Sequence, residues 1–302
     1  MKKFINTLWT CATVAIALMT SSSSVAQQLP QLSLFPENAY VLNPAIAGSN
    51  PWFEVKGMNR TQWTGITDAP RTFTLSLQGP LRNPHMGVGG YLFTDNAGPT
   101  RRTGIQLSYA YHVFLNDKVK LGLGLSGGVL QFAIDGSKIK LAQDGDPALL
   151  GQLQSQTVFD ATFGAHLYGE NWFVGFSLPQ LLQNEISVFD SQNQELNKLE
   201  DHYYIMAGYK YAVNDDIKLE PSVLIKYVSP VPMKWEGNLR LWYKNMVWLG
   251  GSYRSADAVV VMAGYQFKET INLAYAYDIT TSGLKNYSSG THEILVGFRF
   301  NQ

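Results

Sequence analysis

Apolar and polar residues alternate with a period of two along most of this chain, from residue 52 to the C-terminus. In 271–279, one face carries the apolar residues Ile271, Leu273, Tyr275, Tyr277 and Ile279. The same alternation runs through 104–113, 235–244 and 293–300. Because successive side chains of a β-strand point to opposite faces, each segment presents one apolar face and one small or polar face. The chain is therefore expected to fold into strands.

The alternating segments predict about fourteen strands, an even number within the range of outer-membrane barrels. We expect them at 52–63, 70–79, 85–94, 100–114, 117–131, 157–168, 171–178, 201–212, 216–228, 233–244, 246–254, 257–267, 270–279 and 291–300.

Short turns and long loops alternate between these strands. The short turns are 116–117, 169–171, 214–215, 244–245 and 268–269, and the long loops are 132–156, 179–200 and 280–290. Asn, Asp and Gly suit tight turns because they tolerate positive φ or bond to their own backbone. In outer-membrane barrels the long loops lie outside and the short turns in the periplasm, so we expect both termini in the periplasm. The short connections at 230–232 and 255–257 are exceptions on the outer side.

The composition favours a membrane barrel over a soluble one. Charged residues make up only 15% of the chain and aromatic residues 13%, which suits an outer face in contact with lipid. No apolar stretch after residue 26 has the length of a transmembrane helix. Only helices and closed barrels pair every backbone polar group in a bilayer. We therefore predict an all-β, transmembrane antiparallel β-barrel over 52–302, with a soluble sandwich or barrel as the alternative.

The N-terminus has the pattern of an export signal. Met1-Lys2-Lys3 precedes an apolar run and the small residues Ser24 and Ala26, so 1–26 is predicted to be a signal peptide rather than a membrane anchor. Cys11, the single cysteine, falls within it, which leaves no disulfide for the mature chain. Residues 27–51, rich in Pro and Asn, are expected to form an irregular periplasmic or plug segment.

Motifs that could indicate chemistry have structural explanations. The glycines of 122–127 match GxGxxG but lie within one strand, where they leave room for a neighbour or a plug. Asp144-Gly145-Asp146 lacks the further ligands of a calcium loop. Asp201 and His202 point to opposite faces and form no direct dyad. We therefore expect no catalytic, cofactor-binding or metal-binding residues, although a rim enzyme stays an alternative.

The expected lumen charges are of both signs, which favours a salt-bridged, filled lumen over an ion-selective pore. They are Lys118, Lys120, Asp160, Lys210, Lys218, Glu220, Lys226, Lys234, Glu236, Arg240, Lys244, Asp278, Glu293 and Arg299. The chain as a whole has 23 basic and 23 acidic residues, which gives no argument for a nucleic-acid partner.

Several motifs occur in a fixed order along the chain. Leu42-Asn43-Pro44-Ala45-Ile46-Ala47-Gly48 is followed by Arg60-Thr61-Gln62-Trp63-Thr64-Gly65, by Ala69-Pro70-Arg71-Thr72 and by a C-terminal strand that ends at Phe300. This order resembles the PorP/SprF family of outer-membrane proteins of the type IX secretion system over essentially the whole mature chain. Barrel proteins usually end in an aromatic residue, whereas here the two residues Asn301 and Gln302 follow the last aromatic residue, Phe300.

The resemblance implies a non-enzymatic component of the bacterial outer membrane. Such a protein would assist type IX export and anchor cargo, such as gliding adhesins, at the cell surface through the cargo's C-terminal sorting domain. Its implied partners are that cargo, periplasmic peptidoglycan-associated components of the same system, and outer-membrane lipid. A passive, porin-like transporter is the alternative function.

The family-motif residues can be interpreted structurally. Asn43 and Pro44 suit a turn, and Gly48 allows a backbone conformation closed to other residues. Arg60 and Gln62 share the polar face of the first strand, whereas Trp63 falls on the opposite face, where interfacial aromatics belong. We expect these residues, with Pro70, to tie 27–50 into the barrel. The alternative is that Arg60 and Gln62 bind a cargo tail.

The long loops 132–156 and 179–200 are the expected docking surface for a partner. They contain apolar residues that are costly to expose at a water-facing rim, among them Leu149, Leu150, Leu181 and Leu182. Binding residues are often placed on loops carried by a rigid scaffold. The alternative is that these leucines only pack the two loops together as a lid.

Overall fold

The structure is a computed structural model, and it describes residues 30–139, 153–184, 199, 201–229 and 231–300. Its strands are β1 (Phe53–Thr61), β2 (Arg71–Pro80), β3 (Met86–Ala97), β4 (Thr100–Phe114), β5 (Lys120–Asp135), β6 (Leu153–Tyr168), β7 (Trp172–Leu178), β8 (His202–Tyr209), β9 (Tyr211–Ala212), β10 (Ile217–Val228), β11 (Val231–Tyr243), β12 (Val247–Arg254), β13 (Ala258–Phe267), β14 (Ile271–Thr280) and β15 (Thr291–Phe300). Short 3-10 helices are η1 (Ala39–Val41), η2 (Pro44–Ile46), η3 (Gly136–Lys138) and η6 (Gly283–Asn286).

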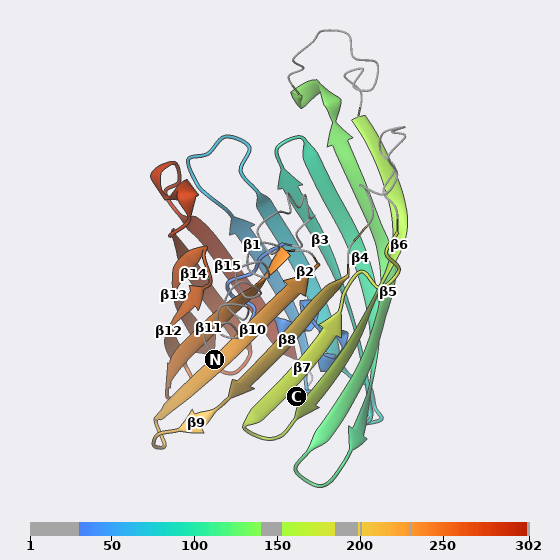
Figure 1. Cartoon of the computed structure of the whole chain (residues 1–302). Coiled ribbons are helices and arrows are strands. Elements are labelled where there is room, and N and C mark those ends of the chain that lie inside the picture. Colours follow the sequence, from blue (N-terminus) through green and yellow to red (C-terminus); the bar gives the residue numbers. More distant parts are fainter. Residues whose placement is uncertain (1–29, 140–152, 185–198, 200, 230, 301–302) are drawn as a thin grey trace, which may run out of the picture.

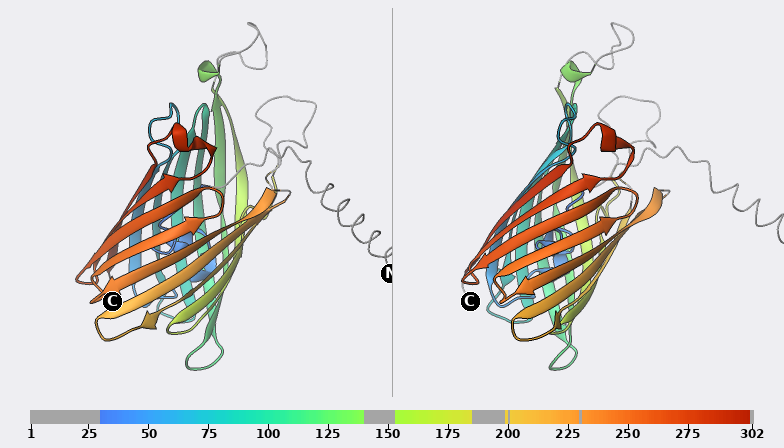
Figure 2. Two further views of the ribbon diagram at one scale, coloured as in Figure 1. Left: turned by 60° about the vertical axis from the view of Figure 1, so that its left-hand side comes forward. Right: turned by 90° about the vertical axis from the view of Figure 1, so that its left-hand side faces the viewer.

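The described strands close into one antiparallel β-barrel (Figures 1 and 2). Each strand pairs with the next in sequence, and β1 pairs with β15, Phe53 lying opposite Phe300. Both β8 and β9 pair with β10, so they are two parts of one strand interrupted at Lys210. Among the described residues, the fifteen segments therefore make fourteen strands around the barrel, which confirms the fold predicted from the alternation.

Residue chemistry explains the short turns. Lys244 and Asn245 both have positive φ (51° and 54°), as do Lys268 and Glu269 (46° and 58°), which matches the twist of a two-residue hairpin. Asn214 Oδ1 accepts hydrogen bonds from two backbone N–H groups of its own turn. These turns gather at one end of the barrel, called the turn end below, and the longer connections gather at the other, called the loop end.

The structure corrects two predictions, the bounds of the loop between β5 and β6 and the placement of two lysines in the lumen. The β5–β6 hairpin continues to Asp135 and restarts at Leu153, so Leu153 belongs to a strand instead of a loop. The cross-strand pairing carries both strands beyond their neighbours at the loop end (Figure 1). Lys118 and Lys244 lie in turns, and not on lumen-facing strand positions.

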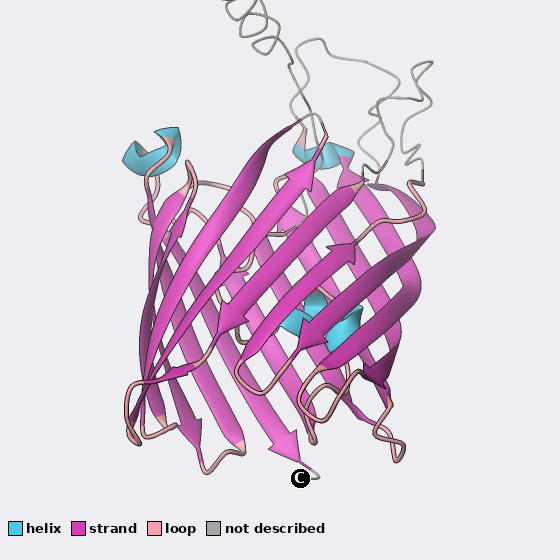
Figure 3. Cartoon of the chain, turned by 60° about the horizontal axis from the view of Figure 1, so that its bottom comes forward, coloured by secondary structure: helices cyan, strands magenta, loops and turns pink. Residues whose placement is uncertain are grey.

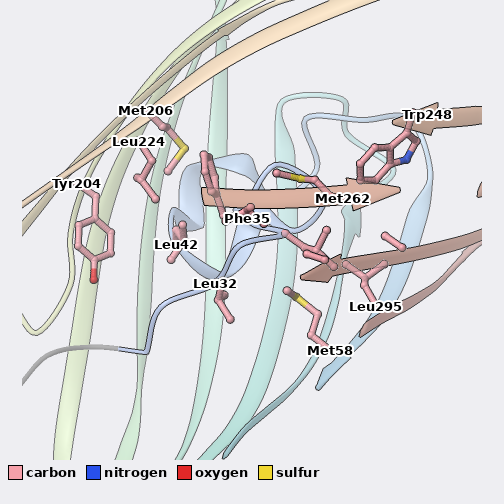
Figure 4. Packing of buried hydrophobic residues seen from close by; sticks show 14 residues of the cluster. Leu32, Phe35, Leu42, Met58, Tyr204, Met206, Leu224, Trp248, Met262 and Leu295 are labelled. Atoms are coloured by element: carbon pink, nitrogen blue, oxygen red, sulfur yellow. The ribbon is translucent and has the colours of Figure 1, made fainter. Parts of the chain in front are cut away.

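The core of the molecule is the lumen of the barrel. Outward-facing residues such as Leu107 and Leu249 are 68% and 64% exposed, which suits contact with lipid. Inward-facing residues are buried, and one apolar cluster joins Leu32, Leu34, Phe35 and Leu42 of the N-terminal segment to the wall (Figure 4). The wall contributes Met58, Tyr204, Met206, Leu224, Trp248, Val260, Met262, Ala274, Ala276 and Leu295. Across the part of the chain that the structure describes, no helix is long and apolar enough to cross a membrane.

Candidate functional site

Residues 30–50, called the inner segment below, lie inside the barrel and cross its lumen (Figures 1 and 3). At the loop end, Gln31 Nε2 donates a hydrogen bond to Glu236. At the turn end, the backbone N–H of Gly48 donates to Gln78 Oε1 over 2.8 Å. The first described residue, Pro30, and the last, Phe300, therefore lie toward opposite ends of the barrel, and both termini of the chain lie outside the described residues.

Ser33 anchors the inner segment to the last two strands. Its backbone N–H and that of Leu34 donate to the two carboxylate oxygens of Glu293, over 2.8 and 3.0 Å. Its hydroxyl lies 2.8 and 2.9 Å from the two oxygens of Asp278. A carboxylate that accepts two backbone N–H groups fixes both the position and the direction of the chain. The strand residues Asp278 and Glu293 thus hold a segment more than two hundred residues earlier in the sequence.

Two arginines complete this anchor. Arg60 forms ion pairs with Asp278 and Glu293, each over 2.8 Å, and Arg254 pairs with Asp278 over 3.0 Å and with Glu236 over 2.8 Å. All five side chains are at most 5% exposed. Buried charges are costly unless they are paired, and removing one partner leaves the other uncompensated, at about 3–5 kcal/mol. Arg60 is therefore buried in the lumen with Nη1 and Nη2 bonded to residues of this anchor, which favours a structural role over the binding of a cargo tail.

Glu37 forms a second anchor, nearer the turn end. It pairs with Arg240 of β11, which also pairs with Glu220 over 2.6 Å, and it accepts a hydrogen bond from Asn272 over 2.6 Å. Burial raises the pKa of Glu37, but the charges of Arg240 and Lys56 outweigh it, so the pKa of this carboxyl lies below its ordinary value. Glu37 is therefore ionised at neutral pH, as the ion pair requires.

The third anchor is η2, which packs against β4, β5 and β6. Asn43 caps this helix: its Oδ1 accepts from the N–H of Ala45, and its Nδ2 donates to the carbonyls of Ala165 and Phe176 over 3.0 and 3.2 Å. Pro44 occupies the first helical position, where its missing N–H costs nothing. Asn43 and Pro44 thus set both the turn and its attachment to the wall.

Glycines of the wall make room for η2. A Cβ on Gly124 would lie 2.3 Å from the backbone nitrogen of Ala45, and one on Gly164 would lie 2.1 Å from Asn43 Oδ1. Real Cβ atoms do not approach other atoms so closely, so a larger side chain would displace the helix. Gly48 has a φ of +73° and lies against Gly87 at the turn end. Gly122 and Gly124 therefore make room for the inner segment from within strand β5, whereas a Cβ on Gly127 would meet nothing within 4 Å.

Gln62, Trp63 and Pro70 close the connection between β1 and β2. The N–H of Gln62 donates to the carbonyl of Pro70 over 2.9 Å, and Trp63 has a φ of 45°. β1 has already ended at Thr61 and Trp63 has a left-handed backbone, so the alternation of β1 does not extend to Trp63. Gln62 and Trp63 line a cavity at the loop end together with Gln31.

The leucines expected to dock a partner are only partly described. Leu181 and Leu182 follow β7 at the loop end and are 42% and 50% exposed. The backbone N–H of Leu181 donates to the carbonyl of Ala161 in β6, so the start of this loop lies against the barrel wall. Leu149 and Leu150 lie outside the described residues.

Cavities remain on both sides of the inner segment. At the loop end, one of about 180 Å³ is lined by Lys226, Lys234 and Arg254. At the turn end, one of about 400 Å³ is lined by Glu37, Lys210, Lys218, Glu220 and Arg240, among others. Within the described residues, no three His, Cys, Asp or Glu side chains are grouped to hold a metal ion. The arrangement is suited to holding a segment and presenting charged cavities.

Sequence reasoning located part of this site. It placed Asp278, Glu293, Glu236 and Arg240 on the lumen face, because each lies on the polar side of an alternating strand. It missed Ser33 and Glu37, since the inner segment has no periodicity and its contacts are all distant in sequence. The one available signal was the presence of an acidic residue in an otherwise uncharged stretch from 27 to 53.

The sequence of this barrel matches a known protein family. A family model described as "Type IX secretion system membrane protein PorP/SprF" matches residues 24–298. The chain belongs to the PorP/SprF family. This agrees with the closed barrel, and the protein is accordingly placed in the bacterial outer membrane. No curated protein matches the sequence significantly.

Solved structures resemble this PorP/SprF protein in fold. A CymD monoaromatic hydrocarbon channel matches with a TM-score of 0.50 and 11% identity, covering 87% of this chain and 91% of that one. The P. putida toluene transporter TodX matches with a TM-score of 0.47 and 10% identity, covering 86% and 92%. A Pseudomonas aeruginosa FadL homologue gives 0.41 and 11%, covering 82% and 88%. At these identities the likeness concerns the barrel fold alone.

Proposed function

We propose that this protein is a non-enzymatic component of the type IX secretion system that assists export and holds cargo at the cell surface. The observation that carries the proposal is the match to the PorP/SprF family over residues 24–298. The occupied lumen supports it, because the inner segment is held by hydrogen bonds from Ser33 and Leu34 to buried carboxylates and by the buried ion pair of Glu37, and the barrel is therefore not an open pore. Cargo recognition would use a C-terminal sorting domain.

We further propose that the loop end faces the exterior and the turn end the periplasm, as in other barrels with long and short connections. The cargo would then dock on the outer loops, where Leu181 and Leu182 expose apolar surface. Periplasmic peptidoglycan-associated components of the same system would meet the turn end. Outer-membrane lipid would surround the exposed aromatic and aliphatic side chains of the strands.

The test replaces both leucines, Leu181→Ser and Leu182→Ser, in the full chain. We expect cargo displayed at the cell surface to fall severalfold while the barrel remains folded, as judged by the different gel migration of boiled and unboiled samples. Tyr287→Ser is the matched control, because Tyr287 is another exposed apolar residue on a connection at the same end. Unchanged display in the folded double variant would favour the lid interpretation of these loops.

Conductance separates this function from that of a passive transporter. A protein whose lumen holds the inner segment in place should give little steady current in planar bilayers. Large, stable steps from the intact protein would instead support a porin-like channel, whatever the result for cargo display.

A further inference from the structure

The lining of the cavity of about 180 Å³ at the loop end has more cations than carboxylates. Its lining includes three cations, Lys226, Lys234 and Arg254, and two carboxylates, Glu236 and Asp257. Both carboxylates are engaged by Arg254, over 2.8 and 3.1 Å. Neither lysine lies within ion-pair distance of these two carboxylates.

The two lysines are direct neighbours across the sheet. Lys226 of β10 is the register partner of Lys234 of β11, so their side chains leave the wall at the same level. Like charges directly opposite each other on one face of a sheet destabilise it. Lys226 is half-buried, and its Nζ donates to the neutral Gln31 Oε1 over 2.9 Å and lies 5.1 Å from the ring centroid of Tyr204. The side chain of Lys234 has no hydrogen bond or ion pair within the described part of the chain.

Polar and aromatic side chains line the rest of this cavity and could contact a bound molecule. Gln31 and Gln62 supply amides that can donate or accept hydrogen bonds, and Trp63 supplies an aromatic surface. Gln31 is already placed by Lys226 and by Glu236, so the cavity is preorganised. The cavity volume accommodates a carboxylate with a short carbon chain, since a water molecule occupies about 30 Å³.

We infer that this cavity is an anion-binding site that takes a carboxylate group between Lys226 and Lys234. The carboxylate would offset the like-charge contact and form charge-assisted hydrogen bonds with both ammonium groups. Two sources present this chemistry at the loop end: a small organic acid, or the acidic side chain of a bound protein. The site does not depend on the proposed role in secretion.

The test titrates the folded full chain in detergent with N-acetyl-glutamate methylamide and follows binding by calorimetry. Saturable binding that weakens with added salt is expected, with no binding of the glutamine counterpart. Lys226→Gln and Lys234→Gln should each weaken binding about tenfold or more, as expected for the loss of a charge-assisted hydrogen bond. Lys234 is exposed, so its variant should fold even where the Lys226 variant does not.

Lys285→Gln is the matched control, because it removes a positive charge from η6 at the same end but outside the cavity. Binding that is absent from the wild type, equal for the glutamine compound, or weakened as much by Lys285→Gln as by Lys234→Gln would overturn the inference. A second titration uses a flexible Gly-Ser peptide with one central Glu. If it binds as well as the small compound, the site admits a protein side chain; if only the small compound binds, the site is one for a free organic acid.

Discussion

The hydroxyl oxygen of Ser33 lies 2.8 Å from Oδ1 and 2.9 Å from Oδ2 of Asp278, which connects the inner segment to strand β14. Arg60 and Arg254 donate to the same oxygen over 2.8 and 2.7 Å. One hydroxyl thus links three charged residues of three strands, and the inner segment is part of the charge network rather than an addition to it.

Replacing this serine tests the link. Ser33→Ala leaves two guanidinium N–H groups without their acceptor in a buried site, so the free energy of unfolding should fall by about 1–3 kcal/mol. Chemical unfolding in detergent, followed by far-ultraviolet circular dichroism, measures the change. Ser282→Ala serves as the control, because the Ser282 side chain makes no capping hydrogen bond. Equal stability of the two variants would contradict the anchoring role.

Steric contact with η2 gives a second prediction. Gly124→Val places side-chain atoms where the backbone of Ala45 lies, so the helix must move and stability should fall by about 1–3 kcal/mol or more. Gly127→Val lies on the same strand and meets nothing within 4 Å, so it should cost little. Thermal unfolding of the two variants side by side is the measurement. A similar loss in both would show that the strand simply disfavours valine.

The second anchor predicts a pH dependence. The pKa of Glu37 is lower in the folded protein than its ordinary value of 4.5, so its contribution to stability is complete above that value. It is lost as the pH falls through the lower, folded-state pKa, because protonation removes the charge that pairs with Arg240. Stability should therefore decline on acidification below about pH 4.5 in the wild type, with a shallower decline in Glu37→Gln. If the stability of the wild type and of Glu37→Gln fell in parallel with pH, Glu37 would not contribute to the pH dependence.

Occlusion by the inner segment gives a fourth prediction. Planar-bilayer current should be low for the intact protein and should rise when residues 30–50 are deleted. The double variant Ser33→Ala with Glu37→Gln keeps the segment but weakens two of its anchors, so intermittent openings are expected between these limits. If the deleted and intact proteins conduct equally, the segment does not block the lumen.

The sequence predicted the barrel well because its signal is local. The alternation in 271–279 and 104–113 requires only that one face of each strand meets lipid, and strands β14 and β4 lie at these positions. The tight turns at Lys244-Asn245 and Lys268-Glu269 were also predicted, although their basic and acidic residues adopt positive φ without a glycine. Strand number and closure follow from these local patterns.

The contacts of the inner segment could not be predicted in the same way. Ser33 bonds to Asp278 and Glu293 over separations of 245 and 260 residues, and nothing in the neighbourhood of Ser33 signals those partners. Trp63 shows the complementary failure, since the alternation places it outward, but it follows the end of β1 with a left-handed backbone and lines the loop-end cavity. A period of two ends with the strand, and beyond it only tertiary contacts decide where a side chain lies.

The position of the inner segment also constrains how the barrel can be assembled. Its anchors involve β14 and β15 through Ser33, β11 through Glu37, and β5 to β7 through η2 and Asn43, so they are distributed around the ring. Because the segment directly precedes β1, which pairs with β15, its contacts with β14 and β15 lie beside the seam where the first and last strands of the barrel meet. The contacts of Ser33 with Asp278 and Glu293 can form only once β14 and β15 are in place, so the filling of the lumen and the completion of the ring are linked events in folding.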